Sequence, residues 1–318
     1  MRPFFENNVL QQQPFKPMII VVDTTKAGSA SNTFVLPIIK ATTETVKIYW
    51  GDGTNSIGVN GDNTHVYAAS GIYTVKIESR LFGGIYFNNL GDKAKITKIA
   101  NYGQGVSRLN IGSFYGCSSL LSIDIGNIVS NGADATNQYR GCTALTTVPL
   151  LNLSSVTDAS SMFAYCPVTT VPLFNLSNCT STWSMFYECT ALTTVPLFDL
   201  SKVTNASYMF YRCLELTTVP LLNLSNLINA SGMFSQCSKL TTVPLFDLSK
   251  VTNASYMFSG VTLTTQSYSD FLINLATLPL QSGVSFHGGN SKYNPAAAIA
   301  RAYLISNFGW TITDGGAA

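Results

Sequence analysis

The sequence predicts a mainly β protein in which a small β-sandwich is followed by a solenoid of repeated units and an α/β C-terminal cap. Two observations carry this prediction. The nineteen residues LTTVPLFDLSKVTNASYMF occur twice, from Leu192 and again from Leu240, and self-similarity at a fixed period is the signature of repeat architectures. Residues 18–87 instead contain short β-rich runs separated by Gly, Asn and Ser, the pattern of a small all-β domain.

Three columns of residues define the repeated unit. The motif TVPL recurs at spacings of 23, 24, 24 and 24 residues, with its prolines at Pro149, Pro172, Pro196, Pro220 and Pro244. A Met-Phe pair and a Cys three residues after the Phe recur in the same register, and two degenerate units extend the columns back to Phe114. We therefore expect units of about 24 residues over 114–261, stacked so that parallel strands lie about 4.8 Å apart.

Each unit is expected to hold one short strand and one helical turn. In the first regular unit, Leu145, Val148, Leu150 and Leu153 alternate as in a strand, with Val148 and Leu150 predicted on its inner face. The next apolar residues recur at three- and four-residue steps, as on one helical face: Val156, Ala159, Met162, Phe163 and Cys166. Because Pro149 has no N–H to donate, we expect the strand ladder to be very short.

This orientation predicts an exposed interaction surface on the strand side of the repeats. The residue after each inward leucine would point outward, giving an apolar column of Leu151, Phe174, Phe198, Leu222 and Phe246. The following residues would form a polar column of Asn152, Asn175, Asp199, Asn223 and Asp247. Contiguous exposed apolar patches usually mark interaction sites. The competing expectation is that the sandwich, a neighbouring subunit or the turn itself buries the apolar column.

Composition excludes two classes of function. The chain of 318 residues is 46% hydrophobic but only 11% charged, well below the roughly 25% of an average soluble protein, so its polar surface must come from Ser, Thr, Asn and Gly. Its net charge of +2 includes no basic run, which argues against nucleic-acid binding. No stretch approaches the ~20 apolar residues of a membrane helix, and the first residues lack the pattern of a secretory signal.

A search for catalytic or metal-binding patterns predicts no enzyme site, no cofactor and no metal. The chain has two histidines, of which His65 is expected to be structural and His287 has no acidic residue nearby. Six of the seven cysteines share one repeat column, without the spacing of a zinc site, and we expect a ladder of buried free thiols. The segment GDGTN at 51–55, with Asp62 and Asn63, offers oxygens to Ca²⁺, but a turn is the favoured interpretation.

Three segments resemble known families. The unit LTTVPLxxLSxVTNASxMFxxC resembles the BspA-type leucine-rich repeat surface proteins, although Asp-Leu-Ser or Asn-Leu-Ser stands where those units often carry Asn-Trp. The motif WGDGT, followed by HVYAASGIYTVKI, resembles a PKD domain. The segment 262–318 resembles the closing segment found after such repeats. Together they imply a PKD/Ig-like sandwich at 18–87, a linker and N-terminal cap at 88–113, repeats at 114–261 and a C-terminal cap at 262–318.

These resemblances imply display on the outside of a bacterium or of a particle that meets one. We expect a phage virion component that binds other virion proteins or a host-surface protein or glycan. The expected anchor is the N-terminal arm, residues 1–17, through Phe4, Phe5, Val9, Leu10 and Phe15. The missing signal pattern and the reduced cysteine column favour this hypothesis, since a lytic particle assembles in the cytoplasm. The alternative is a bacterial cell-surface adhesin. A homo-oligomer through the arm or the apolar column is possible, whereas a glycan-active enzyme would need a catalytic domain for which the chain leaves no room.

Overall fold

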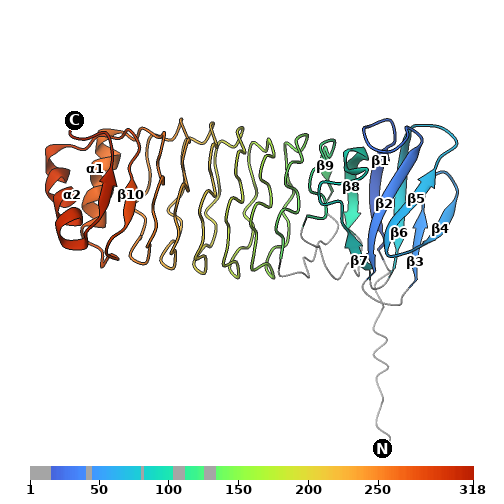
Figure 1. Ribbon diagram of the computed structural model, residues 1–318, viewed down its shortest axis with the longest axis horizontal. Coiled ribbons are helices and arrows are strands. Elements are labelled where there is room, and N and C mark those ends of the chain that lie inside the picture. Colours follow the sequence, from blue (N-terminus) through green and yellow to red (C-terminus); the bar gives the residue numbers. More distant parts are fainter. Residues whose placement is uncertain (1–15, 41–44, 80–81, 103–111, 125–133) are drawn as a thin grey trace, which may run out of the picture.

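The described residues form an elongated, mainly β rod. The computed structural model describes residues 16–40, 45–79, 82–102, 112–124 and 134–318. A module of two β-sheets occupies one end, a stack of coils forms the middle, and the two α-helices of the described ranges lie at the other end (Figure 1). The predicted anchoring residues Phe4, Phe5, Val9, Leu10 and Phe15 lie outside the described residues.

The N-terminal module consists of two sheets that pack face to face. Their strands are β1 (Met18–Asp23), β2 (Thr33–Lys40), β3 (Val46–Tyr49), β4 (Asn55–Gly58), β5 (Gly61–Val66), β6 (Ile72–Glu78), β7 (Phe82–Ile85), β8 (Ile96–Tyr102) and β9 (Ser122–Ile123). One sheet has the order β4-β3-β6-β1-β8-β9 and the other β5-β2-β7. Alternate residues of β1 and β2 are buried. A Cβ on Gly58 would lie 3.0 Å from Ile38 of one sheet and 3.2 Å from Ile48 of the other, so side chains of both sheets meet in one core.

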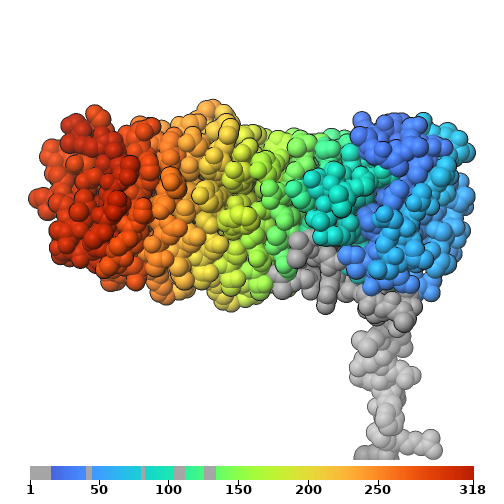
Figure 2. Space-filling view, viewed as in Figure 1, coloured from blue at the N-terminus to red at the C-terminus, as the bar shows by residue number. Residues whose placement is uncertain are grey.

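The larger sheet runs directly into the stack of coils. Strand β8 pairs antiparallel with β1 and parallel with β9, which belongs to an early coil. Residues 88–113 were predicted to be a linker and cap, but 96–102 are a full strand of this sheet, and a short 3-10 turn (Lys93–Lys95) leads into it. The boundary predicted at residue 87 is therefore too early. The two-sheet module and the coils form one continuous body in the space-filling view (Figure 2).

Equivalent residues of successive coils are joined by parallel backbone hydrogen bonds. On one side of the coil, Thr193 N donates to Thr169 O at 3.0 Å, and Thr217 N donates to Thr193 O at 3.2 Å. On the other side, single bridges connect Asp158, Ser181, Asn205, Asn229 and Asn253 in turn. Residues 134–261 contain these bridges and turns in place of extended strands, so the ladder that proline was expected to shorten is reduced to single bonds.

The predicted helical turn is wrong, because this segment forms consecutive β-turns. Met162 N donates to Ala159 O at 3.2 Å and Cys166 N donates to Phe163 O at 3.0 Å, which are i to i+3 bonds. The N–H of Phe163 donates instead to the next coil. Two residues per coil have a left-handed backbone, such as Tyr165 at φ 64°, and a right-handed helix cannot continue through such residues. Apolar spacing at three and four residues therefore reflects successive turns.

The coil interior is a set of ladders made by the repeat columns. Aromatic rings stack from Phe114 through Tyr139 to Phe258, with neighbouring centroids 5.5–5.9 Å apart. All seven cysteines are buried and unpaired, as predicted. Burial raises the pKa of the Cys237 thiol to about 12 and that of Cys179 to about 11. Because the thiolate is the reactive form, these cysteines pack as small apolar side chains.

The C-terminal segment covers the last coil with mixed helix and strand. It contains α1 (Thr265–Leu275), β10 (Ser285–His287), α2 (Pro295–Phe308) and β11 (Thr311–Thr313). Phe271 of α1 packs edge-to-face on Phe258 with centroids 5.8 Å apart, and Ala254 bridges to Phe286 of β10. Helix α2 begins at Pro295 as expected and ends at Phe308, where Gly309 caps it with φ 66°.

Candidate interaction surfaces

The predicted apolar column is not on the surface. All five of its residues are at most 3% exposed: Leu151, Phe174, Phe198, Leu222 and Phe246. The leucine one position earlier is exposed in every coil instead, by 49–61%: Leu150, Leu173, Leu197, Leu221 and Leu245. The predicted orientation is therefore wrong by one residue, and the competing expectation of burial is correct for this column, with the coil's own core as the cover.

A three-residue turn after the proline explains the reversed orientation. Phe198 N donates to Pro196 O at 2.9 Å, and the same bond joins Leu222 to Pro220 at 2.8 Å. This i to i+2 bond is a γ-turn, which places Leu197 at its tip and directs Phe198 back into the core. Alternation of inward and outward side chains holds for extended strands, so a prediction based on that alternation fails at this turn.

The predicted polar column has a structural role in the turns. Asn152 Oδ1 accepts hydrogen bonds from Ser154 N at 3.2 Å and Ser154 Oγ at 2.7 Å. Asp199 Oδ1 accepts from Ser201 N at 3.0 Å, and hydrogen bonds from Ser201 lower the pKa of Asp199. Asn175, Asn223 and Asp247 cap the equivalent serines in their coils. These are Asx-turns, in which a short polar side chain satisfies the backbone two residues later.

The five exposed leucines form a leucine stripe along one side of the stack: Leu150, Leu173, Leu197, Leu221 and Leu245. Each follows a partly buried proline and two exposed threonines, as in Thr193 and Thr194. At its C-terminal end the stripe reaches a groove of about 580 Å³ between the last coil and α1, lined by Leu245, Ile273 and polar side chains. Among the described residues the stripe is therefore an exposed apolar row on five coils, with prolines and threonines on one side and the polar column, which includes Asp199 and Asp247, on the other.

A second surface, the tyrosine ladder, lies on the turn segment of the coils: Tyr115, Arg140, Tyr165, Tyr187, Tyr208 and Tyr211. The Arg140 guanidinium lies over the rings of Tyr115 and Tyr165, 5.5 and 5.3 Å from their centroids. The Tyr187 ring stands 5.4 Å from Tyr165 and 4.6 Å from Tyr211, and Tyr208 packs edge-to-face on Tyr211. Each side chain is partly exposed or exposed.

The backbone under the tyrosine ladder is one that glycine normally adopts. Tyr165 and Tyr208 have φ values of 64° and 56°, a region that costs an ordinary residue about 1–2 kcal/mol. The equivalent positions of other coils hold glycine, as at Gly141, or other residues with the same backbone, as at Ser184 and Glu188. A Cβ on Gly232 would collide with the ring of Tyr208, so this glycine leaves room for the tyrosine.

Sequence reasoning missed the tyrosine ladder, although a signal was present. The two identical nineteen-residue stretches are followed by YRC after Phe210 and by SGV after Phe258. The copies therefore diverge where the chain enters this surface. Trp183 and Tyr256 occupy the same turn segment of their coils and are 42% and 58% exposed.

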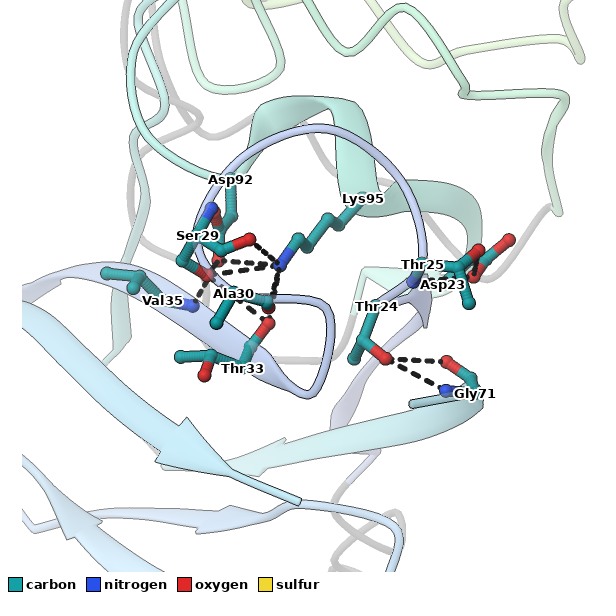
Figure 3. Close-up of polar contacts among 10 residues, drawn as sticks. All are labelled: Asp23, Thr24, Thr25, Ser29, Ala30, Thr33, Val35, Gly71, Asp92 and Lys95. Atoms are coloured by element: carbon teal, nitrogen blue, oxygen red, sulfur yellow. Dashed lines mark hydrogen bonds and ion pairs between the residues drawn. The ribbon is translucent and has the colours of Figure 1, made fainter. Parts of the chain in front are cut away.

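The junction of the two parts holds a buried ion pair (Figure 3). Lys95 is fully buried, and its Nζ donates to Thr33 O at 2.7 Å, to Ala30 O at 2.9 Å and to Ser29 O at 3.1 Å. Asp92, 3.8 Å from Lys95 Nζ, accepts hydrogen bonds from Ser29 N and Val35 N. These bonds tie the β1–β2 loop to the segment that enters β8, so the pair locks the start of the coil stack to the sheets.

The two histidines have structural partners. His65 Nε2 donates to Asp52 Oδ2 at 2.8 Å and stacks on Trp50, and His287 Nδ1 accepts from Gly289 N at 3.0 Å. Burial alone would raise the pKa of Asp52, but hydrogen bonds from Thr54 and His65 outweigh it and lower this pKa to about 2. The structural partner of His65 is therefore this carboxylate.

The oxygens considered for Ca²⁺ are engaged within the turn. Asp52 Oδ1 accepts from Thr54, and Asn63 Oδ1 accepts from Val59 N. In the part of the chain that the structure describes, no group of three or more His, Cys, Asp or Glu is placed to hold a metal ion. None of the helices in the described ranges is long and apolar enough to cross a membrane.

Comparison with known proteins gives one match, which falls on the repeats. Residues 133–242 and 157–271 match a family model described as a Mycoplasma protein of unknown function, DUF285. The two matches overlap and together cover less than half of the chain, from the degenerate units to helix α1. No curated protein and no solved structure matches the chain. The similarity therefore concerns the coil stack and not the two-sheet module.

Proposed function

We propose that the protein is a non-enzymatic recognition or structural protein displayed on the outside of a phage particle, where it binds a host-surface protein or glycan or another virion protein. In this proposal the coil stack is a leucine-rich-repeat solenoid of the BspA type and the two-sheet module is a PKD-like sandwich. The observation that carries the recognition role is the tyrosine ladder.

The chemistry of the tyrosine ladder suits recognition of a partner. Tyr, Trp and Arg are the residues enriched among those that contribute most binding energy at protein interfaces. Here Tyr187 and Tyr211 hold each other in place by stacking, so little side-chain entropy remains to be lost on binding.

The architecture around the ladder supports a display role. The continuous pairing of β1, β8 and β9 and the buried Asp92–Lys95 pair connect the stack rigidly to the module. A ladder carried on this rod is held at a set distance from whatever anchors the N-terminal end. The arm, residues 1–17, is the proposed anchor because its sequence combines several aromatic residues with few charges.

One observation favours a location on a phage particle, and another favours the surface of a bacterial cell. Seven reduced thiols, six of them in adjacent coils, are consistent with assembly in a reducing cytoplasm followed by release in a particle. The match of the repeats to the DUF285 model, together with their resemblance to BspA-type proteins, favours the alternative of a bacterial cell-surface adhesin. Both locations place the tyrosine ladder outside a cell.

A density gradient of the producing culture tests the location. Co-migration of the full chain with DNA-filled particles after a salt wash would support the virion proposal, and deletion of residues 1–17 should then abolish incorporation while the chain still folds. Banding with cell envelopes in a culture free of particles would contradict it and support the adhesin.

The recognition role is tested with a double variant, Tyr187→Ala and Tyr211→Ala. We expect loss of attachment to host cells, while Ile299→Ala, a 79% exposed position on α2, should attach normally. Equal attachment by all three proteins would refute a role for the ladder.

A further inference from the structure

Repetition within the chain shows which residues the coils do not need for their own packing. Residues that pack between coils recur, as the Met-Phe pair and the following Cys do in four successive coils from Met162 to Cys237. The two residues between Phe and Cys differ in each of these coils: Ala-Tyr, Tyr-Glu, Tyr-Arg and Ser-Gln. The second residue of each pair is exposed or partly exposed: Tyr165, Glu188, Arg212 and Gln236. Packing between the coils therefore does not determine these side chains, which stand beside the tyrosine ladder.

The side chains of Glu188 and Arg212 have no partner among the described residues. Both residues have a left-handed backbone, with φ of 54° and 55°, and they occupy equivalent positions of adjacent coils. Burial raises the pKa of the Tyr187 hydroxyl, and the charges of Glu188 and Arg212 shift this pKa in opposite directions, so both groups lie near it. Glu215 and Lys239, which are also 24 residues apart, form an ion pair. By contrast, neither the Glu188 carboxylate nor the Arg212 guanidinium has a hydrogen bond or an ion pair within the described part of the chain.

The groups around Tyr187 combine three kinds of hydrogen-bonding side chain. A carboxylate only accepts hydrogen bonds, a guanidinium only donates them, and a phenol hydroxyl does both. Two neighbouring hydroxyls of a sugar ring can donate to the carboxylate and accept from the guanidinium at the same time. The partly exposed rings of Tyr187 and Tyr211, which stack with centroids 4.6 Å apart, add an aromatic surface against which the C–H groups of a sugar can pack.

Charge favours a neutral ligand, and composition favours a glycan over a protein. A charged ligand would be attracted by one of the two unpaired groups, Glu188 and Arg212, and repelled by the other, whereas a neutral ligand meets no such repulsion. Glutamate is depleted at the interfaces of protein complexes, because a buried charge without a partner is costly. We propose that the tyrosine ladder, together with Glu188 and Arg212, binds a neutral glycan through neighbouring hydroxyls of one sugar unit. This inference rests on the proposed recognition role and names the class of ligand for the same surface.

Single variants test the two charged groups against a matched control. Glu188→Ala and Arg212→Ala should each weaken attachment of the full chain to host cells at least about tenfold, since each removes hydrogen bonds made by a charged group. Lys202→Ala removes a positive charge outside the ladder, where Lys202 bonds Asn178, and should attach like the wild type. The circular dichroism spectra of all three variants should be unchanged, because the substituted side chains are exposed or partly exposed. Attachment at the wild-type level by either Glu188→Ala or Arg212→Ala would overturn the proposal.

Chemical treatment of the host cells separates a glycan from a protein. Periodate cleaves the bond between neighbouring hydroxyls of a sugar, so it should abolish attachment of the wild-type chain, whereas periodate quenched beforehand with glycerol should not. On a surface that carries neutral and sialylated oligosaccharides, the wild-type chain should bind neutral members and Arg212→Ala should not.

The outcomes distinguish this inference from the recognition role on which it rests. Attachment that survives periodate but is lost after proteinase K would assign a protein partner, which would overturn the inference and leave the recognition role intact. Binding to sialylated oligosaccharides alone would overturn the neutral class. A wild-type chain that attaches neither to untreated cells nor to any oligosaccharide would overturn both the inference and the recognition role.

Discussion

Neighbouring substitutions at Phe198 and Leu197 test the orientation of the repeats. Phe198 is 1% exposed, and its ring stacks on those of Phe174 and Phe186, with ring centroids 6.1 and 6.2 Å apart. Truncation of a buried phenylalanine to alanine costs about 3–5 kcal/mol. We expect the upper part of this range for Phe198→Ala, since two ring contacts of about 0.5–1.5 kcal/mol each are lost and hydrogen bonds between coils limit collapse around the cavity.

The adjacent leucine is the matched control. Leu197 is 59% exposed, and substitution of an exposed residue usually changes stability by less than about 0.5 kcal/mol. Urea unfolding followed by circular dichroism gives the change in the free energy of unfolding of each variant from the midpoint and slope of its transition. The proteins should be compared at a concentration where sedimentation shows monomers, so that association does not contribute. A larger loss of stability for Leu197→Ala than for Phe198→Ala would refute the γ-turn orientation and restore the alternating one.

Three further predictions concern the junction, the sheets and the ladder. Lys95→Met should lower the free energy of unfolding by about 3–5 kcal/mol in urea titration, because it leaves Asp92 buried without its cation; an unchanged midpoint would show that the pair does not lock the junction. Because the pKa of Asp52 in the folded protein is about 2, below its ordinary 3.8, the stability that its carboxylate contributes should be present above pH 4 and lost as pH falls towards 2. Asp52→Asn should remove this component of the pH dependence in thermal unfolding, and a variant with the full acid sensitivity of the wild type would contradict the assignment. Gly232→Ala should destabilise the protein by at least about 1–2 kcal/mol through its left-handed backbone and the collision with Tyr208, and Tyr208→Ala should relieve part of this cost in a double-mutant cycle.

The repeat columns were predictable because they depend on local spacing. Period, core aromatics and the buried thiols follow from residues that recur every 24 positions, since stacked units place each residue against its own copy. The helical turn was mispredicted for a related reason. Turns with left-handed residues at Tyr165 or Arg212 reproduce the apolar steps of a helix, and a list of apolar positions does not contain the backbone angles.

The surfaces depended on contacts that the local pattern does not contain. The alternation of a strand predicted an outward side chain for Phe198. In the structure, a hydrogen bond from Phe198 N–H to Pro196 O turns the backbone and directs this side chain inward. Strand β8 was taken for a linker because its partner β1 lies more than seventy residues earlier in the chain, and pairing over that distance leaves no signal in the segment itself. The tyrosine ladder joins residues from different columns of different coils, so its members share no common spacing.

The sequence by itself determined the architecture of this protein: a β-rich N-terminal part, units of about 24 residues, their buried columns and a closing cap. These properties follow from burial of apolar residues that recur at regular intervals, which is visible in one dimension. Tertiary structure alone decided which leucines face solvent, where the sheet ends and which tyrosines meet. Those outcomes are set by turn geometry and by pairing between distant segments, and a one-residue change in orientation exchanges the core for the surface.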